Sequence, residues 1–293
     1  MKVGVMLMSE VNYEQILSAG EHELVSEKAC AAYLFALKWP HGFVCPECRH
    51  CKAYTIVTRR LPLFQCVKCS FQASLTSGTI MERSRTPLVK WFAAIRFMSS
   101  MDKGISALAL SRELKLTYKT AWTMLHRIRT AMANEELDFP MEGEVAIHND
   151  TYACPRYHGS LSPQPRESRV IVGATLSKAG EPERVTIQTV EKVHWNSWRF
   201  NRSAVRHFME TRMDWKARLV YSPINFYTSP RHKKRLSVMK DAARWLNNTF
   251  HGIGKKHLQS YLLEFCCRVN LSLAGRPAFH TISQICTDSR TVA

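Results

Sequence analysis

Half of the chain's 10 cysteines lie in one short stretch, and their spacing fits a metal site. Cys45 and Cys48 form one Cys-x-x-Cys pair, Cys66 and Cys69 form a second, and seventeen residues separate the two pairs. Two residues between sulfurs let one tight turn direct both thiolates at one ion, and two such turns complete a tetrahedron. The spacing therefore predicts a structural zinc site in a ribbon whose middle has room for a hairpin.

Other interpretations of the cysteines remain open from the sequence. The four thiols could be free or could form two redox pairs, although a reducing compartment favours the metal. Cys51 breaks the symmetry of the pattern and is interpreted as a spectator, with replacement of Cys48 as its alternative role. Cys266 and Cys267 fall in a helical pattern and are predicted to be a buried apolar pair.

The charge balance indicates a polyanionic partner. The 293 residues contain 41 Lys and Arg against 24 Asp and Glu, which leaves a net charge of +17. Nucleic acid or an anionic membrane surface would explain such a balance. No stretch reaches the roughly eighteen unbroken apolar residues of a transmembrane helix, and Met1–Glu10 lacks a secretory cleavage pattern. We therefore expect a soluble, cytoplasmic protein that binds nucleic acid and not a membrane.

The first third of the chain places the cysteine ribbon in context. An amphipathic helix is predicted over Leu24–Leu37, and a strand between the cysteine pairs over Tyr54–Thr58. So small a ribbon needs its metal to stay folded. Its cations, which include Arg59 and Arg60, could lie along phosphates, but basic ribbons without DNA contact are equally common.

Residues 84–134 have the pattern of a helix-turn-helix. Thr86-Pro87 opens a first helix, Ala107–Leu114 forms a second, and Thr117 caps a third. The third helix carries an apolar stripe opposite a polar face, and a recognition helix in a DNA major groove has this character. The alternative is a three-helix core with a solvated polar face. The candidate DNA-binding residues of the polar face are Lys119, Thr120, Thr123 and Arg127.

The second half of the chain, after an acidic linker at Asn134–Pro140, is patterned as strands and helices. The order strand, hairpin, helix, strand is that of a ribonuclease-H-like core, in which carboxylates at the ends of the first and fourth strands hold Mg²⁺. Asp150 lies just past the first strand, whereas the residues after the fourth offer no acid. The predicted elements are strands at Val145–His148, Arg169–Leu176, Arg184–Val190 and Arg218–Tyr221, with a helix at Arg202–Met213.

Short motifs along the chain resemble those of bacterial insertion-sequence transposases. The group in question has an N-terminal zinc ribbon, a helix-turn-helix and a DDE-type nuclease core, and is related to the Merlin transposons. The resemblance covers about Leu24 to Asn270. The motifs that carry it are Trp39–Cys48, Ser74–Ile80, Thr86-Pro87-Leu88 with Trp91-Phe92, Lys103–Leu108, Tyr118–Trp122, Arg244-Trp245-Leu246, His251-Gly252, Lys256–Gln259, Tyr261–Phe265 and Arg268-Val269-Asn270.

This resemblance implies a fold, cofactors and partners. The fold class would be multidomain α+β, with a zinc ribbon and helix-turn-helix followed by a ribonuclease-H-like mixed α/β domain. Zinc would be structural, and Mg²⁺ would serve DNA cleavage and strand transfer in the active site. The partner would be double-stranded DNA, both as terminal inverted repeats and as target DNA. A homo-oligomer assembled on the DNA is also compatible with the resemblance.

The sequence departs from the family where the Mg²⁺ ligands belong. The family's first strand ends in Asp-Glu-Thr-Tyr, and the corresponding residues here are His148–Tyr152. The family's Asp is thus either lost or displaced by one residue to Asp150, which is the catalytic candidate. Ser222-Pro223 replaces the second Asp, and the third ligand falls near Leu236. Because two Mg²⁺ ions need several carboxylates, we predict a catalytically impaired copy.

Further charged residues carry alternative interpretations. Asp241 and Glu264 are candidate substitutes for the lost ligands, although Glu264, at helical spacing from Arg268, is more simply interpreted as a structural partner. In the basic cluster at residues 231–235, Lys233 and Lys234 are candidate phosphate contacts.

The predicted domains are an N-terminal helical segment at 1–38, the zinc ribbon at 39–80, the helix-turn-helix at 84–134, the ribonuclease-H-like domain at 142–270, and a tail at 271–293. The tail from Gly275 onward matches nothing in the family and is expected to be disordered or frame-altered. The predicted function is that of an impaired transposase. The alternatives are a non-catalytic DNA-binding remnant or repressor of related elements, and an unrelated zinc-ribbon transcription factor.

Overall fold

The computed structural model describes residues 24–100, 104–153, 167–196, 199–200, 202–221 and 233–288. The chain folds into two compact units. The first comprises Met1–Ser99, Leu110–Ala131 and Phe279–Ala293, and the second comprises Ser100–Ala109 and Met132–Ala278. Mixed α and β elements occur in both. Most of the predicted N-terminal segment lies outside the described residues.

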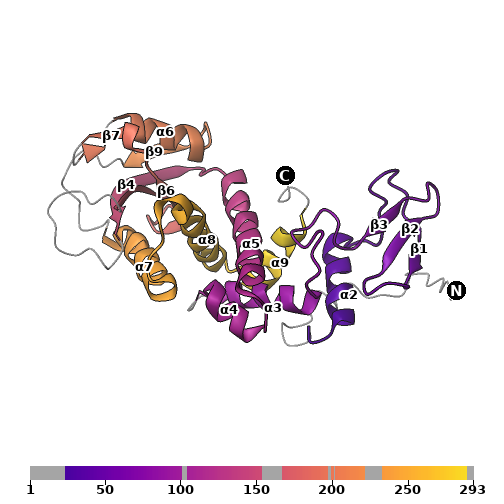
Figure 1. Ribbon diagram of the computed structural model, residues 1–293. Coiled ribbons are helices and arrows are strands. Elements are labelled where there is room, and N and C mark those ends of the chain that lie inside the picture. Colours follow the sequence, from indigo (N-terminus) through magenta and orange to yellow (C-terminus); the bar gives the residue numbers. More distant parts are fainter. Residues whose placement is uncertain are drawn as a thin grey trace. The chain divides into compact units, whose positions relative to one another are not determined.

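A three-stranded antiparallel ribbon and one helix open the first unit (Figure 1). The helix α2 spans Glu27–Lys38, and its first turn is capped by the Ser26 hydroxyl, which accepts a hydrogen bond from the Ala29 N–H at 3.1 Å. The strands of the ribbon are β1 (Ala53–Ile56), β2 (Leu63–Cys66) and β3 (Gln72–Ser74). Phe35 and Trp39 pack on Phe64 of β2 with ring centroids 5.0 and 5.4 Å apart. These rings form the apolar core that joins α2 to the ribbon.

Four more helices contribute to the first unit: α3 (Leu88–Ser99), α4 (Ala107–Glu113), α5 (Tyr118–Asp138) and α9 (Ala278–Thr287). The carboxylate of Glu27 accepts hydrogen bonds from the Leu88 and Val89 N–H groups at 3.1 and 3.2 Å. An acid at a helix N-terminus satisfies free N–H donors and interacts favourably with the positive end of the helix dipole. One side chain at the start of α2 thus also caps α3.

The structure corrects two sequence predictions, one at the C-terminal end and one in the middle of the chain. The expected disordered tail instead contains α9, because Phe279 stacks on Tyr33 at 6.1 Å and the Ile80 N–H donates to the Cys286 carbonyl at 3.1 Å. The expected linker at 134–140 is wrong as well, since α5 continues to Asp138. Its Glu136 is buried and paired with Arg184 at 3.0 Å, which stabilises an acid near a helix C-terminus.

The second unit contains a four-stranded sheet in the order β6-β5-β4-β9. Strands β4 (Glu144–Tyr152), β5 (Ser168–Leu176) and β6 (Pro182–Thr189) are antiparallel, and β9 (Arg218–Tyr221) runs parallel to β4. Between β6 and β9 lie a short turn of 3-10 helix at Lys192–His194, the two-residue strands β7 (Trp195–Asn196) and β8 (Arg199–Phe200), and helix α6 (Arg202–Arg212). The first strand is longer than predicted, so Asp150 lies within β4, opposite Val170 of β5, rather than past its end.

Helices cover both faces of this sheet (Figure 1). On one face, α7 (Lys233–Phe250) and α8 (Lys255–Leu273) pack on Val170 and Val172. On the other, Ile171 packs against α6, as the alternation of side chains along a strand requires. A Cβ on Gly173 would lie 2.6 Å from the ring of Phe208. Only glycine therefore lets α6 approach so closely.

Helix α8 closes the edge of the sheet with two amide side chains. Asn270 accepts from the Val185 N–H at 2.8 Å and donates to the Val185 carbonyl at 2.9 Å. Gln259 accepts from the Thr189 N–H at 2.6 Å and donates to the Ile187 carbonyl at 2.9 Å. An open strand edge invites pairing with other chains. These amides take the place of a neighbouring strand along β6.

Candidate metal centre and nucleic-acid interface

The four paired cysteines converge on one point. The Sγ atoms of Cys45 and Cys69 lie 3.6 Å apart, as do those of Cys48 and Cys66, and all four lie within 4.8 Å of one another. Zinc–sulfur bonds of about 2.3 Å in a tetrahedron place sulfurs about 3.8 Å apart. The donor set and its spacing therefore fit a structural zinc ion, as the sequence predicted.

The two cysteine pairs sit in matching turns. In the first turn, the Arg49 N–H donates to the Cys45 carbonyl at 3.0 Å, and in the second the Ser70 N–H donates to the Cys66 carbonyl at 3.0 Å. Arg49 and Ser70 follow the second cysteine of each pair and have φ angles of 62° and 60°. This left-handed conformation reverses the chain at once. Both sulfurs of a pair can therefore face the same ion.

Burial and hydrogen bonding act in opposite directions on the Cys66 thiol. Burial raises its pKa, but backbone N–H groups of Cys69 and Lys68 and neighbouring thiols outweigh this effect and lower the pKa to about 7. A thiolate is the form that binds metal. Cys51 is exposed and stands outside the cluster, with its Sγ near the Arg49 carbonyl at 3.7 Å, in agreement with a spectator role.

Lys38 joins α2 to the turn that follows the ribbon. Its ammonium donates to the carbonyls of Ser74, Leu75 and Ser77 at 3.0, 3.3 and 2.5 Å. Burial lowers the pKa of Lys38 to about 8, while Glu82 opposes this change. The turn after the ribbon is therefore held by a half-buried cation.

The two candidate DNA-contacting arginines in the ribbon differ in whether they bond to other residues of the protein. Arg60 donates to the Arg85 carbonyl at 3.0 Å and lies 3.7 Å from the Glu27 carboxylate. Arg59 is exposed and has no such partner in the described part of the chain. Arg59 is thus the better placed of the two to meet a phosphate.

The start of α5 presents a polar and aromatic face. Residue Lys115 has a φ of 48° and the Leu116 N–H donates to the Ser111 carbonyl at 2.9 Å, which ends α4 sharply. The Thr117 hydroxyl then caps α5 by accepting from the Thr120 N–H at 3.2 Å. Tyr118 is 58% and Trp122 39% exposed. These two rings lie on the exposed side of the helix, at helical spacing.

The four candidate residues on α5 divide into two kinds. Lys119 and Thr123 are exposed, with the Thr123 hydroxyl donating to the Lys119 carbonyl at 2.9 Å, whereas the Thr120 hydroxyl lies 2.9 Å from that of Thr117 in the cap. Arg127 donates through Nη1 to the carbonyls of Ile80 and Glu82 at 2.9 and 3.0 Å. Arg127 therefore fixes the segment after the ribbon to α5.

The catalytic candidate Asp150 is an isolated carboxylate among the described residues. Burial raises its pKa, while the Thr151 N–H, which donates to it at 2.7 Å, and Lys240 oppose the rise. The positions expected for the second and third ligands, 223 and 236, lie where no side chain is described. Within the described residues the one group of three or more potential metal ligands is the cysteine cluster.

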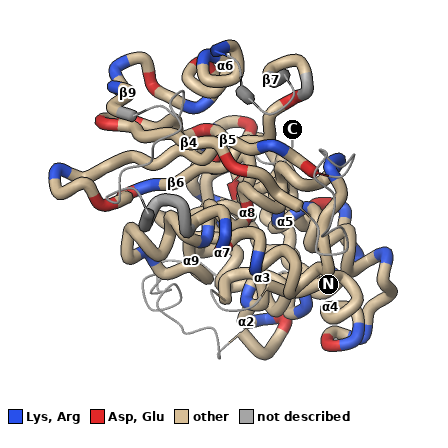
Figure 2. The backbone as a smooth tube through the Cα atoms, turned by 90° about the vertical axis from the view of Figure 1, so that its left-hand side faces the viewer, with Lys and Arg blue, Asp and Glu red and all other residues tan. Residues whose placement is uncertain are grey.

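The other charged candidates do not complete a second metal site in the described residues. Asp241 is paired with Arg244 at 3.1 Å, and Glu264 is 1% exposed. Lys233 and Lys234 begin α7, but their side chains lie outside what is described. Cations nevertheless recur along the described part of α7 (Figure 2).

The similarity of this chain to known proteins supports a zinc site at the four cysteines. Residues 25–72 match a family described as the transposase zinc-ribbon domain. A protein described as "Uncharacterized protein in transposable element ISH50", from Halobacterium salinarum, is 30% identical over 153 residues. The chain resembles an insertion-sequence transposase with an N-terminal zinc ribbon.

The extent of these matches is limited. The aligned region is 50% of this chain and 48% of the Halobacterium protein, so the chain spans about half the length of that relative. The zinc-ribbon match covers both cysteine pairs and ends within β3. No solved structure matches the chain.

Within the described residues, no helix has the length and apolar character needed to cross a bilayer.

Sequence reasoning missed several residues that organise these sites. Glu27, Lys38, Gln259 and Asn270 are polar side chains that bond to backbone groups of distant segments. Gln259 and Asn270 lie in the motifs that carry the family resemblance, which was the only signal available for them. The backbone groups to which these four side chains bond come close to them only when the chain folds.

Proposed function

We propose that this protein is an insertion-sequence transposase that binds terminal inverted repeats through its zinc ribbon and a helix-turn-helix, and whose cleavage chemistry is impaired. The observation that carries the proposal is the four-thiolate cluster in a segment that matches transposase zinc-ribbon domains. The net charge of +17 adds support, because phosphate neutralisation dominates DNA affinity.

The helix-turn-helix assignment rests on α4, the short turn and α5. Four residues separate the two helices, and the second begins with a hydroxyl cap and an exposed Lys119 and Thr123. Residues near the N-terminal end of a recognition helix are the ones that contact base edges. We therefore assign Lys119 and Thr123 to DNA contact and Arg127 to holding the helix in place.

The ribonuclease-H-like assignment of the second unit is supported by its strand order. Three antiparallel strands are followed by a helix and by a fourth strand that runs parallel to the first, β4. Mg²⁺ does not fit the residues described around Asp150, since one carboxylate cannot replace the several that two Mg²⁺ ions require. We therefore expect the protein to bind DNA without cutting it efficiently. The alternative function, a DNA-binding remnant that represses related elements, would use the same DNA-binding residues.

The experiment is duplex binding and nicking with DNA from the ends of the element that encodes the chain. We expect salt-sensitive binding and no Mg²⁺-dependent cleavage. Replacing Arg59 or Lys119 by alanine should each reduce the slope of log K against log salt by about 0.9 for every phosphate that the variant no longer neutralises. Lys178→Ala, in the exposed β5–β6 turn, is the charge-matched control. Efficient nicking by the unaltered chain would disprove the impairment, and salt-independent binding would disprove the interface.

A further inference from the structure

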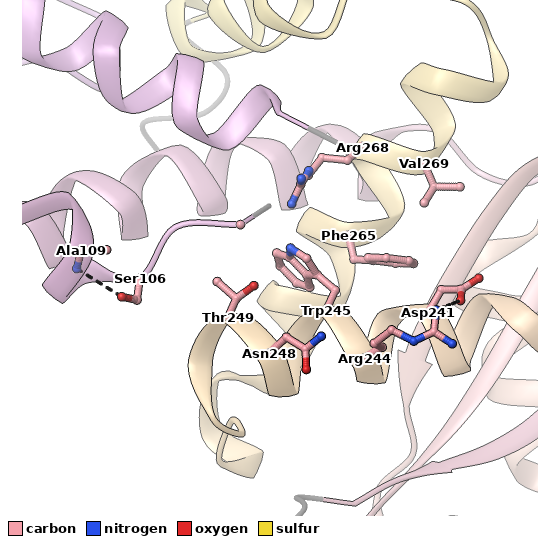
Figure 3. A pocket seen from close by; sticks show the side chains of 11 residues that line it. Ser106, Ala109, Asp241, Arg244, Trp245, Asn248, Thr249, Phe265, Arg268 and Val269 are labelled. Carbon is pink, nitrogen blue, oxygen red and sulfur yellow. Dashed lines mark hydrogen bonds and ion pairs between the residues drawn. The ribbon is translucent and has the colours of Figure 1, made fainter. Parts of the chain in front are cut away.

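A cavity of about 660 Å³ lies in the second unit, between α7, α8 and the segment that leads into α4 (Figure 3). Its walls combine the rings of Trp245 and Phe265 with polar side chains from α7. None of the clustered cysteines lines it, and neither does any residue assigned above to DNA contact. The cavity therefore needs an explanation of its own.

The indole N–H of Trp245 is buried without an acceptor. Trp245 is 8% exposed, and its Nε1 has no hydrogen-bond partner among the described residues. Leaving such a donor unsatisfied is unfavourable, and native structures rarely do so. Figure 3 shows the nitrogen on the side of the ring that faces Arg268, another residue that lines the cavity. A ligand atom with a lone pair would satisfy this group.

Glycine at position 104 keeps the space next to this N–H open. A Cβ on Gly104 would lie 2.6 Å from Trp245 Nε1 and 3.0 Å from the Thr249 methyl carbon. Any side chain here would press on the indole and fill that end of the cavity. The Gly104 position and the unsatisfied donor are independent observations that concern the same space.

The remaining lining groups are mostly donors. The Asn248 amide and the Thr249 hydroxyl make no side-chain hydrogen bond within the described part of the chain. Arg244 has a side chain 69% exposed and is paired with Asp241, the one carboxylate in the lining. An exposed ion pair contributes little and exchanges readily for another anion. The guanidinium of Arg268 lies 5.3 Å from the Trp245 ring centroid and donates to the Ser100 carbonyl.

We propose that this cavity binds one nucleotide of an unpaired DNA strand, with its phosphate at Arg244 and an acceptor of the nucleotide at the Trp245 N–H. This inference rests on the proposed DNA-binding function. A nucleotide joins an anion, several acceptors and a flat apolar base, which is the complement of a cavity with donors, a guanidinium and aromatic walls. A paired nucleotide is excluded because its base edge and face are already occupied in the duplex.

The first test observes the Trp245 indole N–H directly by two-dimensional ¹H–¹⁵N NMR of the full chain, with Trp245→Phe used to assign the resonance. Titration with a short oligothymidine should shift this resonance, and Gly104→Ala should remove the shift and weaken binding about tenfold, the worth of one hydrogen bond. Gly254→Ala is the matched control, since a Cβ there meets nothing within 4 Å. An unmoved resonance at saturation, or equal affinity of the two alanine variants, would overturn the proposal.

A second experiment distinguishes binding in the cavity from non-specific electrostatic binding of DNA. Arg244→Gln should weaken oligothymidine binding more than Lys255→Gln, which removes an equal charge from an exposed position on α8. Equal losses would mean that only counterion release is measured, and the proposal would fall. Thymidine monophosphate should shift the indole far less than the oligonucleotide, and an equal response would show a free-nucleotide site instead.

The two proposals can fail separately. Salt-sensitive duplex binding without any indole shift from oligothymidine would reject the cavity inference and leave the DNA-binding function standing. Absence of duplex binding would reject the proposed function, and the indole response to oligothymidine would then decide the cavity alone.

Discussion

The cysteine cluster and the edge of the sheet at Asp150 are two sites of the kind that hold metal, and they differ in completeness. Around the first, four ligand atoms lie within 4.8 Å of one another. Around the second, a single carboxylate has Lys240 and a backbone N–H as its neighbours. The ligands of the cluster come from two short turns within one segment, Cys45 to Cys69. Those of a nuclease edge must come from several distant elements.

This difference shows how the two kinds of site depend on the rest of the fold. The cysteine turns carry their own geometry, since Arg49 and Ser70 adopt the same conformation and make the same backbone hydrogen bond. The sheet around Asp150 is held by packing and hydrogen bonds: α7 and α8 pack on one face, α6 packs on the other, and amides close its edge. Since these contacts do not pass through the Asp150 carboxylate, we expect the fold of the sheet to depend little on a metal at this edge.

The largest expected effect is loss of the zinc site in Cys45→Ser. Zinc binding by such small domains contributes on the order of 10 kcal/mol to folding, so the ribbon should unfold and zinc content should fall to zero. Zinc is measured by mass spectrometry, and amide exchange follows β1–β3 and β4–β6 separately. Cys51→Ser, outside the cluster, is the control and should retain full zinc. Undiminished zinc in Cys45→Ser, or loss of β4–β6 protection, would contradict the distinction between the two regions.

The second effect concerns the edge of the sheet that contains Asp150. Asn270→Ala leaves the Val185 N–H and carbonyl without partners and removes a donor to Glu136. Unsatisfied buried groups of this kind should lower the free energy of unfolding by about 2 to 4 kcal/mol, measured by urea denaturation. Ser272→Ala, exposed on the same helix, should change it little. If Asn270→Ala were as stable as this control, closure of the sheet edge would need another explanation.

A smaller effect tests how far the ribbon depends on groups other than its cysteines. Lys38→Met keeps the side-chain length but removes three hydrogen bonds to the turn after β3. We expect a decrease of about 2 kcal/mol in the free energy of unfolding, with zinc still bound. Lys28→Met, exposed on the same helix, provides the comparison. Loss of zinc in the Lys38 variant would show that the turn and the metal site are one cooperative unit.

The smallest effect is expected for Asp150→Asn. Burial raises the pKa of Asp150 above its ordinary 3.8, so the folded state binds this proton more tightly than the unfolded state. Stability should therefore fall as pH rises from 3.8 through the raised pKa, and the variant should lack this decline. At neutral pH the change should stay below about 1 kcal/mol. A rise in Tm on adding Mg²⁺ that Asp150→Asn abolishes would show a functioning metal site at this edge.

Much of the secondary structure could be predicted from local pattern. The strand at Arg218–Tyr221 and the hairpin of β5 and β6 occur as expected, because alternating apolar residues and a turn between them are local signals. The helix α9 and the last turns of α5 were not foreseen. Their stability comes from partners far away in sequence, such as Tyr33 for Phe279 and Arg184 for Glu136.

The sequence alone identified the four cysteines that cluster, since both spacing and turn geometry are confined to a few residues around each cysteine pair. Only the tertiary structure decided which exposed cations bond to the fold: Arg127 donates to the Ile80 and Glu82 carbonyls, whereas no such bond is seen for Lys119 among the described residues. It alone also revealed the buried indole N–H of Trp245 beside Gly104. Hydrogen bonds and cavities between distant segments depend on packing, and no periodicity along the chain records them.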